Sequence, residues 1–436
     1  MTPVSTPPSH SKTAAMTYLP ALKETDPEIR DLIIEEEKRE TYKLRLIPSE
    51  NYASHAVREG TGSVLTNKYS EGYPKKRYYE GQQITDQVET LACERAKKIF
   101  GADHVNVQPH SGSPANMAAY RAILKPGDTI MGLSLPHGGH LTHGWKSNFS
   151  GTLYNSVPYE LDYETEMLNF DKIREQAKEC KPQLIIAGYT AYPRTIDWTK
   201  FREICDEVGA KFHADTSHIT GLIAGGQHPN PFPIADTGIT TTHKTLRGPR
   251  GAMILCKEEY ADAVNKAIIP GIQGGPHMHT ISAIAVALKE ATTPDFKAYA
   301  VQIVKNAKAL ADRLLSHGFR LVSGGTDNHL ILMEVFESKG ILGRDASRAL
   351  DKAGIVCNCN MVPFDKNSPF NPSGLRIGTP SMTSRGMKEP EMEKLGDWMN
   401  EVISNIEDEA NLKRIEGEVK EMCSGFPCPG IDPSKW

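Results

Sequence analysis

Residues 240–251 read TTTHKTLRGPRG, and this stretch is the most informative feature of the sequence. Its three β-branched threonines predict the end of a β-strand, because such residues favour strands. Lys244 follows them directly, ahead of a glycine-rich turn, and the stretch contains no acidic residue. A lysine that a strand end presents to a polar cleft can lose its proton and attack a carbonyl carbon. The stretch therefore predicts a Schiff-base lysine, with an ordinary surface loop lysine as the alternative.

A second motif, residues 211–218 (KFHADTSH), places Asp215 at the end of a short apolar run. A pyridoxal phosphate ring needs a carboxylate beside its pyridine nitrogen, which keeps that nitrogen protonated so that the ring accepts electrons. An aspartate at the carboxyl end of a strand, ahead of the lysine strand, suits this role. Asp215 is therefore predicted to pair with the ring nitrogen, with a helix N-cap as the alternative.

The third motif is residues 108–116 (QPHSGSPAN), between a predicted strand and a predicted helix. We expect Ser113 to be the helix N-cap and Pro114 to be the first helical residue. Free backbone N–H groups and two hydroxyls at a helix N-terminus form a cradle for an anion. No GxxxxGK[ST] pattern is present, so the motif does not indicate a nucleoside-triphosphate P-loop. A cradle, an aspartate and a lysine in this order predict a pyridoxal phosphate site.

The composition of the 436 residues, with 39% hydrophobic and 24% charged, is typical of a soluble globular protein. The formal net charge of -4 gives no reason to expect nucleic acid or an acidic membrane as a partner. No run is long and apolar enough to span a bilayer. The eight cysteines are scattered, and the closest pair, Cys357 and Cys359, lacks a second pair at zinc-ligand spacing. We therefore expect no metal site, and free thiols in a reducing cytoplasm.

Short apolar runs alternate with helical patterns along most of the chain. Runs at residues 129–133, 184–188 and 252–256 predict strands, and their alternation with helices indicates βαβ units. The expected fold class is α/β, with a mixed, mostly parallel sheet covered by helices in a large pyridoxal-phosphate-transferase domain. After a break at residues 292–294, a helix and two short strands predict a smaller α+β domain at the C-terminus.

We expect four parts along the chain. Residues 1–16 are rich in Pro, Ser and Thr, lack the features of a signal or transit peptide, and are predicted to be disordered. Residues 17–55 are a helical arm, in which Asp26 is the expected N-cap of a helix. Residues 56–292 are the large cofactor-binding domain, and residues 293–436 are the small C-terminal domain.

Further motifs stand in order along the chain: IPSENY (47–52), NKYSEGYP (67–74), RYY (77–79), HGGHLTHG (137–144), QGGP (273–276), GGTDNH (324–329) and RIGTP (376–380). With these motifs the chain resembles the serine hydroxymethyltransferase family, from about residue 47 to about residue 380. The resemblance implies an aspartate-aminotransferase-like fold, pyridoxal 5'-phosphate as the cofactor, and a homodimer whose subunits share their active sites.

The resemblance also implies roles at the cofactor. Lys244 holds the cofactor covalently as an aldimine, Asp215 pairs with the pyridine nitrogen, and His140 stacks on the ring. His218 is a candidate hydrogen-bond partner for the phenolic oxygen of the cofactor ring. The resemblance also assigns His218 and Thr241 to catalysis. The other residues implied in cofactor binding are Ser111, Gly112, Ser113, His243, Tyr69 and Gly275.

Further residues are implied in binding the two substrates. Arg376 offers a planar fork for the carboxylate of an amino acid, and Ser49 and Tyr79 resemble residues that support this carboxylate. Glu71 resembles the general acid–base of the family. The residues implied at a folate pocket are Glu71, Tyr78, Leu135, Gly139, Leu141 and Asn360. Those that resemble residues contributed across the dimer interface are Tyr69, Glu71, Tyr79, Gly274 and Gly275.

The implied activity is reversible transfer of the hydroxymethyl carbon of L-serine to tetrahydrofolate, which yields glycine and 5,10-methylenetetrahydrofolate. Two alternatives use the same lysine: a folate-independent threonine-type aldolase or transaldolase, and an α-methylserine hydroxymethyltransferase. A non-catalytic regulatory relative is a third. Ser217 and Glu80 depart from the common family pattern, so both bear on the range of substrates.

Overall fold

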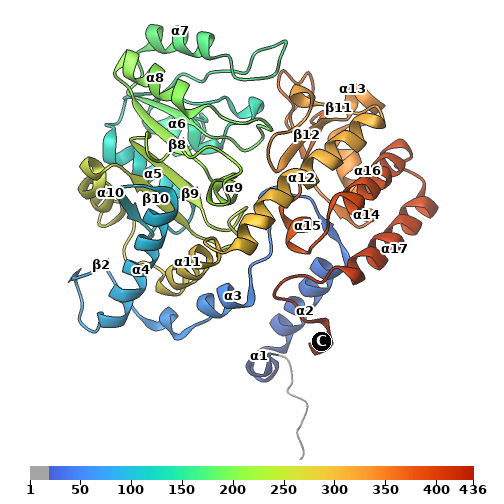
Figure 1. The fold of residues 1–436 in the computed structure, drawn as a ribbon, viewed down its shortest axis with the longest axis horizontal. Coiled ribbons are helices and arrows are strands. Elements are labelled where there is room, and N and C mark those ends of the chain that lie inside the picture. The colour runs from blue at the N-terminus through green and yellow to red at the C-terminus, as the bar shows by residue number, and fades with distance from the viewer. Residues whose placement is uncertain (1–18) are drawn as a thin grey trace, which may run out of the picture.

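The computed structural model describes residues 19–436, which are built around a seven-stranded sheet (Figure 1). The strand order is β4 (His104–Asn106), β10 (Ala252–Cys256), β9 (Thr237–Thr241), β8 (Lys211–Asp215), β7 (Leu184–Ala187), β5 (Thr129–Met131) and β6 (Asn155–Ser156). Strand β10 is antiparallel to both of its neighbours, and every other adjacent pair is parallel. The predicted mixed, mostly parallel sheet is confirmed.

Helices cover both faces of this sheet. In β10, Ile254 packs with α5 (Gly112–Ile123) and α10 (Ala261–Ile268) on one face. Its neighbours Met253 and Leu255 belong to a larger cluster on the other face. The helices of that face are α4 (Gln83–Phe100), α7 (Phe170–Cys180), α8 (Trp198–Val208), α9 (Thr220–Ala224) and α11 (Met278–Glu290). Because successive side chains of a strand point to opposite faces and both faces are covered, β7, β9 and β10 are buried along their whole length.

A second, antiparallel sheet lies towards the C-terminus, beside the first in Figure 1. Its order is β11 (Arg320–Leu321), β12 (Leu330–Glu334), β15 (Gly374–Gly378) and β14 (Asn358–Asn360). The helices in this part are α12 (Pro294–Ser316), α13 (Phe336–Lys339), α14 (Gly343–Lys352), α15 (Pro380–Ser384), α16 (Glu389–Ser404) and α17 (Glu409–Gly425). Helix α12 joins the two parts, since Phe296 packs in the large core and Leu310 in the C-terminal core.

The N-terminal arm contacts the C-terminal part of the chain. It comprises α1 (Pro20–Thr25), α2 (Pro27–Tyr42) and β1 (Leu44–Arg45), and β1 pairs in parallel with β13 (Ile355–Val356). The next helix, α3 (His55–Thr61), packs instead against α11. The Asp26 side chain accepts a hydrogen bond from the backbone N–H of Ile29 at 3.1 Å, so the predicted N-cap is confirmed. The predicted disordered segment 1–16 lies outside the described residues, and the domain boundaries at residues 56 and 293 stay predictions.

Helix α5 begins earlier than its sequence motif predicts. Ser111, whose backbone is extended, is the N-cap, and the helix starts at Gly112. The expectation that Ser113 is the N-cap and Pro114 the first helical residue is therefore wrong. Pro114 is tolerated inside the first turn because the N–H groups of that turn have no intrahelical partner. The Ser111 hydroxyl forms no capping bond within the described chain, which leaves it available for a ligand.

None of the helices in residues 19–436 combines the length and the apolar character that crossing a membrane requires. Within the same residues, no group of three or more His, Cys, Asp or Glu side chains is arranged to hold a metal ion. All eight cysteines fall in the described part of the chain, and each is a free thiol.

Candidate active site

The three predicted motifs meet at one edge of the large sheet. Because β8 and β9 are parallel, Asp215 and Lys244 follow strands that end at the same edge, where the N-terminus of α5 also lies. A cavity of about 360 Å³ opens there. Its lining includes eleven of the predicted residues: Ser49, Ser111, Gly112, Ser113, His140, Asp215, His218, Thr241, His243, Lys244 and Arg376. Six further lining residues were not predicted as site residues: Asn116, His143, Tyr189, Thr190, Ser217 and Arg250.

Lys244 is partly buried in this cavity, and its backbone carbonyl accepts a hydrogen bond from Asn51 Nδ2 at 2.9 Å. Burial lowers the pKa of its amine to about 8, with Arg376 and Arg250 acting in the same direction and Asp215 acting against them. A lowered pKa leaves a fraction of the amine neutral near neutral pH, which a nucleophilic amine requires. The alternative of an ordinary surface lysine does not fit these surroundings.

Asp215 is held as an anion by three hydrogen bonds. Its carboxylate accepts from Asn116 Nδ2 at 3.0 Å, from the Ser217 backbone N–H at 3.1 Å, and pairs with His143 Nε2 at 3.1 Å. Burial by itself would raise the pKa of this carboxyl, but the hydrogen bonds from His143 and Ser217 and the neighbouring imidazoles of His143 and His140 together outweigh burial, so the pKa lies well below its usual range. The nearest following helix, α9, has Ile219 as its N-cap, so the alternative N-cap role of Asp215 is wrong.

A chain of buried polar side chains behind Asp215 was not predicted. Asn116 Oδ1 lies 2.9 Å from His213 Nε2, and His213 Nδ1 lies 2.9 Å from Thr237 Oγ1. Burial lowers the pKa of His213 to about 3, so its ring is neutral and fixes the orientation of the Asn116 amide. The sequence offered one indication of this chain of side chains, the polar residue Asn116, which lies one turn into the helix that follows residues 111–113.

The rim of the cavity near Lys244 has the features of an anion site. A Cβ atom on Gly112 would lie 2.8 Å from Thr241 Cγ2, so only glycine fits without a shift of the neighbouring side chain. His243 Nδ1 is buried and has no hydrogen-bond partner among residues 19–436. Burial, together with the charges of Arg250 and Lys244, lowers the pKa of His243 to about 3. Arg250 also lines this rim and adds positive charge.

Two histidines face the middle of the cavity in their neutral forms. Burial and the neighbouring His143 lower the pKa of His140 to about 4, and its Nδ1 lies 2.7 Å from Thr142 Oγ1. Burial also lowers the pKa of His218 well below its ordinary value, and its Nδ1 lies 3.4 Å from His329 Nε2. A neutral imidazole can stack on a ring or exchange a hydrogen bond without adding charge.

Arg376 approaches the cavity from β15 of the C-terminal sheet. Its Nη1 donates to the Thr190 backbone carbonyl at 2.9 Å, and its Nε donates to Asn358 Oδ1 at 3.3 Å. Burial lowers the pKa of the guanidinium to about 10, so it remains charged at neutral pH. These two bonds leave other N–H groups of the fork for a carboxylate in the cavity.

Five predicted residues lie together outside this cavity. Tyr79 Oη donates to Glu71 Oε2 at 2.9 Å, and the ring centroids of Tyr69 and Tyr79 are 5.8 Å apart. A Cβ atom on Gly274 would lie 3.0 Å from Glu71 Oε1, and one on Gly275 would lie 3.1 Å from the Tyr69 ring. Tyr69 and Tyr79 are 60% and 49% exposed, so this surface cluster is open in the single chain. We call these five residues the Glu71 cluster.

The residues implied at the folate pocket are divided among three places. Leu135 lines a small cavity next to His140 and His143, whereas Leu141 is 45% exposed. Tyr78 is 68% exposed beside the Glu71 cluster. Asn360 ends β14, and its amide donates to the Met361 carbonyl at 2.7 Å. A Cβ on Gly139 would lie 2.0 Å from the Leu133 carbonyl oxygen, so close backbone packing alone requires glycine there.

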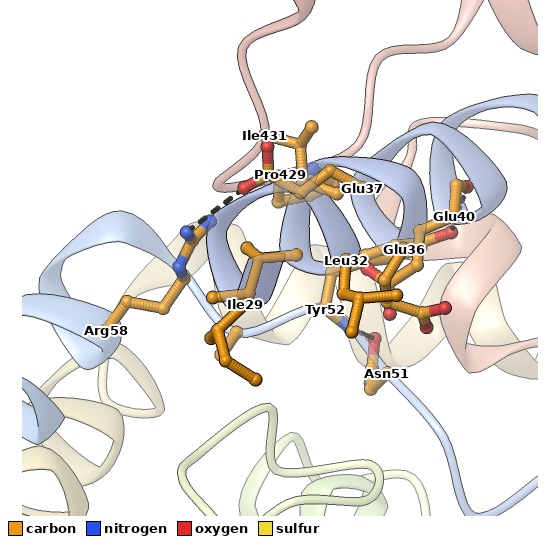
Figure 2. A pocket seen from close by; sticks show the side chains of 12 residues that line it. Ile29, Leu32, Glu36, Glu37, Glu40, Asn51, Tyr52, Arg58, Pro429 and Ile431 are labelled. Atoms are coloured by element: carbon orange, nitrogen blue, oxygen red, sulfur yellow. Dashed lines mark hydrogen bonds and ion pairs between the residues drawn. The ribbon is translucent and has the colours of Figure 1, made fainter. Parts of the chain in front are cut away.

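A second cavity, of about 480 Å³, lies against α2 and the C-terminal tail (Figure 2). Ile29 and Leu32 form its apolar side, as Figure 2 shows. Arg58 on α3 also lines it and donates to the backbone carbonyl of Gly430. None of the predicted site residues lines it. The chemistry of Lys244 and Asp215 therefore belongs to the smaller cavity at the sheet edge.

A seven-stranded sheet with a partly buried lysine, an ionised aspartate and an anion cradle at one edge defines an α/β enzyme of the pyridoxal-phosphate-transferase fold. The model of the family described as serine hydroxymethyltransferase matches residues 22–399. The chain belongs to the serine hydroxymethyltransferase family.

Curated relatives named serine hydroxymethyltransferase align with almost the whole length of this chain. The protein of Desulfotalea psychrophila is 59% identical over 421 residues, which cover 97% of this chain and 99% of the relative. The protein of Sorangium cellulosum is 60% identical, with the same two coverages. The protein of Acidothermus cellulolyticus is 57% identical over 420 residues, or 95% of this chain and 98% of the relative.

Proposed function

We propose that this protein transfers the hydroxymethyl carbon of L-serine to tetrahydrofolate, reversibly, with pyridoxal 5'-phosphate as its cofactor. The observation that carries the proposal is the cavity itself. It brings together an amine of lowered pKa (Lys244), an ionised carboxylate (Asp215) and a guanidinium with N–H groups left for a ligand (Arg376). Membership of the family supports the choice of substrates.

The residues present fit the proposed cofactor. Lys244 would bind its aldehyde carbon, Asp215 would accept the N–H of its pyridinium ring, and His140 would lie against the ring face. Ser111, Gly112 and Ser113 would hold the phosphate at the start of α5, where N–H groups have no helical partner. The Nδ1 atom of His243 at this rim is also buried without a hydrogen-bond partner among residues 19–436, so it could bond to the cofactor. When bound, pyridoxal phosphate supplies an electron sink at the substrate α-carbon.

The side chains of this chain then have separate tasks. Arg376, with Ser49 nearby, orients the amino acid by its carboxylate, while Asp215 keeps its negative charge against the ring nitrogen. Lys244 would hold the cofactor, and with its lowered pKa its neutral amine would also be available to accept a proton. His218 and Thr241 lie on the lining close to Lys244, where they position the cofactor and the proton being moved.

Serine cleavage measured with and without tetrahydrofolate tests this function. We expect rapid formation of glycine from L-serine only when tetrahydrofolate is present. Equal rates in both conditions would instead identify a folate-independent aldolase. Turnover of α-methylserine in place of serine would identify that hydroxymethyltransferase, and no turnover with a bound cofactor would identify a regulatory relative.

Covalent binding of pyridoxal phosphate by the cofactor-free protein is expected to become faster as the pH rises. The neutral amine is the reactive form, and the pKa of Lys244 is about 8. Its neutral fraction therefore rises about tenfold between about pH 7 and about pH 9. Stopped-flow absorbance of the reconstituting protein measures this rate. A rate that stays constant or falls over this range would contradict the lowered pKa.

We further propose a homodimer in which the Glu71 cluster of each subunit completes the active site of the other. In the single chain this cluster is exposed and lies outside the lining of the Lys244 cavity. Tyr69 and Gly275 would then reach the cofactor phosphate of the partner, and Glu71, Tyr78 and Tyr79 its substrates. The unpaired thiols support a reducing compartment, the cytoplasm, as the location.

Subunit exchange between two inactive variants tests the shared site. A Lys244→Ala protein mixed with a Glu71→Gln protein forms heterodimers in which one site carries both changes and the other carries neither. We expect folate-dependent activity to return to about half of the wild-type value per heterodimer. Differently tagged subunits, purified through both tags, prove that exchange has occurred. Proven heterodimers without activity would place Glu71 in the site of its own chain.

A further inference from the structure

Phe364 has an unusual backbone for a large side chain. It lies in the loop 361–373, which connects Asn360 on β14 to the strand that carries Arg376. Its φ angle is +59°, in the left-handed region, where residues with a Cβ atom are disfavoured and a bulky residue is an outlier. Such a conformation persists only where surrounding contacts hold the residue in place.

Aromatic contacts hold Phe364 in place. Its ring centroid lies 4.4 Å from that of His137, at an interplanar angle of 66°. It also lies 4.9 Å from the ring centroid of Tyr163, at 70°. Both are edge-to-face contacts, the arrangement that aromatic pairs prefer. His137 is only 5% exposed, and its Nδ1 accepts a hydrogen bond from the Leu161 backbone N–H at 3.1 Å, so the contact is with a fixed ring.

Hydrogen bonds and apolar packing also hold the loop that carries Phe364 in place. The Asp365 carboxylate accepts hydrogen bonds from the Asn367 and Ser373 backbone N–H groups, both at 2.9 Å, and from the Ser373 hydroxyl at 2.6 Å. The neighbouring Val362 packs in a cluster with buried residues of β12. These contacts therefore fix the backbone that holds the Phe364 ring against His137.

These contacts connect segment 135–141 to β14 along two routes. His137 lies between Leu135 and Gly139, and the carbonyl of Gly139 accepts a hydrogen bond from Thr190 Oγ1 at 2.9 Å. The Thr190 carbonyl in turn accepts from Arg376, which bonds to Asn358 on β14. From β14 the chain returns through Asn360 to Phe364. The contact of Phe364 with His137 is therefore a second connection between segment 135–141 and the chain that leaves β14, in addition to the connection through Arg376.

We infer that Phe364 is a positioning residue for the folate pocket. It fixes loop 361–373 on segment 135–141, so that Leu135, Leu141 and Asn360 keep the spacing that a flat pterin needs. This inference rests on the proposed function. It assigns Phe364 an effect on the binding of tetrahydrofolate and none on the binding of serine, which uses Arg376.

The test replaces the ring and leaves the backbone undisturbed. Phe364→Asn removes the aromatic contacts, and asparagine tolerates the left-handed region better than other residues with a Cβ atom. Phe364→Tyr keeps the ring and should restore function. Lys366→Ala is the matched control, because Lys366 lies in the same loop and its side chain is 87% exposed.

For Phe364→Asn we expect the KM for tetrahydrofolate to rise about tenfold, the size expected from losing two aromatic contacts. The KM for serine and the folate-independent cleavage of a β-hydroxy amino acid should stay within about twofold. Hydrogen exchange in peptides that cover residues 135–143 should become faster, independently of activity. Phe364→Tyr and Lys366→Ala should match the wild type in every measurement.

An unchanged KM for tetrahydrofolate, or unchanged exchange in residues 135–143, would overturn the inference. So would equal losses in the folate-dependent and folate-independent reactions, because those indicate a general structural role. A wild-type protein without tetrahydrofolate-dependent transfer would overturn the proposed function as well. That result is separate, since it is read from the wild type before any variant is compared.

Discussion

Lys244→Ala is expected to abolish serine turnover, with a loss of about 10⁴-fold or more, the scale seen when an enzyme loses its nucleophile. The reason is that no other amine among the cavity-lining residues can bind the aldehyde of the cofactor. Borohydride treatment of the wild-type protein with pyridoxal phosphate should attach the cofactor to Lys244, as peptide mass spectrometry would show. The variant should give no reduced adduct at this site.

Lys172→Ala provides the control for this experiment. Lys172 pairs with Asp162 on the surface, and its side chain is 66% exposed, so its loss should leave both turnover and labelling unchanged. Labelling of another lysine in the wild-type protein, or substantial turnover by Lys244→Ala, would show that the Schiff-base residue has been assigned wrongly.

Glu71→Gln is expected to reduce transfer from serine to tetrahydrofolate by about 100-fold or more, within the range for removal of an acid–base group. Glutamine keeps the shape and can still accept a hydrogen bond from Tyr79 Oη, but it cannot transfer a proton. Folate-independent cleavage of a threonine-like β-hydroxy amino acid should be largely retained, because its aldehyde leaves unaided. Both reactions are to be assayed on one preparation.

Glu175→Gln is the matched control for Glu71→Gln. Glu175 is exposed on α7 and does not line the Lys244 cavity, so the same change of charge should leave both reactions within about twofold. Equal losses of both reactions in Glu71→Gln would place Glu71 at a step common to them, and its specific link to folate would have to be abandoned.

The position of the active site was predictable because three short local patterns carry it. A strand followed by Lys244, a strand that ends in Asp215, and a helix that follows the cradle each depend on residues next to one another in sequence. Parallel strands place such ends at one edge, so the sheet brings the three together. The exact start of α5 was less predictable, since two serines and a proline offered competing caps and the structure uses Ser111.

The surroundings of Asp215 could not be predicted in the same way. Asn116 and His143 are 99 and 72 residues away from it in sequence, and His213 is 97 residues from Asn116. Nothing local marks these side chains as partners, because their contacts depend on how α5, η3 (Leu141–His143) and β8 are packed. The same holds for Phe364, since phenylalanine gives no local signal for a left-handed backbone.

The α/β class, and the placement of Lys244, Asp215 and residues 111–113 at the ends of strands and the start of a helix, could be predicted from the sequence alone. These features follow from hydrophobic periodicity and from the preferences of neighbouring residues, which act over a few positions. Only the tertiary structure decided that Lys244 has a pKa of about 8, that Asp215 stays ionised, and that the Glu71 cluster lies outside the cavity of its own chain. The physical reason is that burial and charge pairing depend on segments far apart in sequence, which meet only when the sheet and its helices have packed.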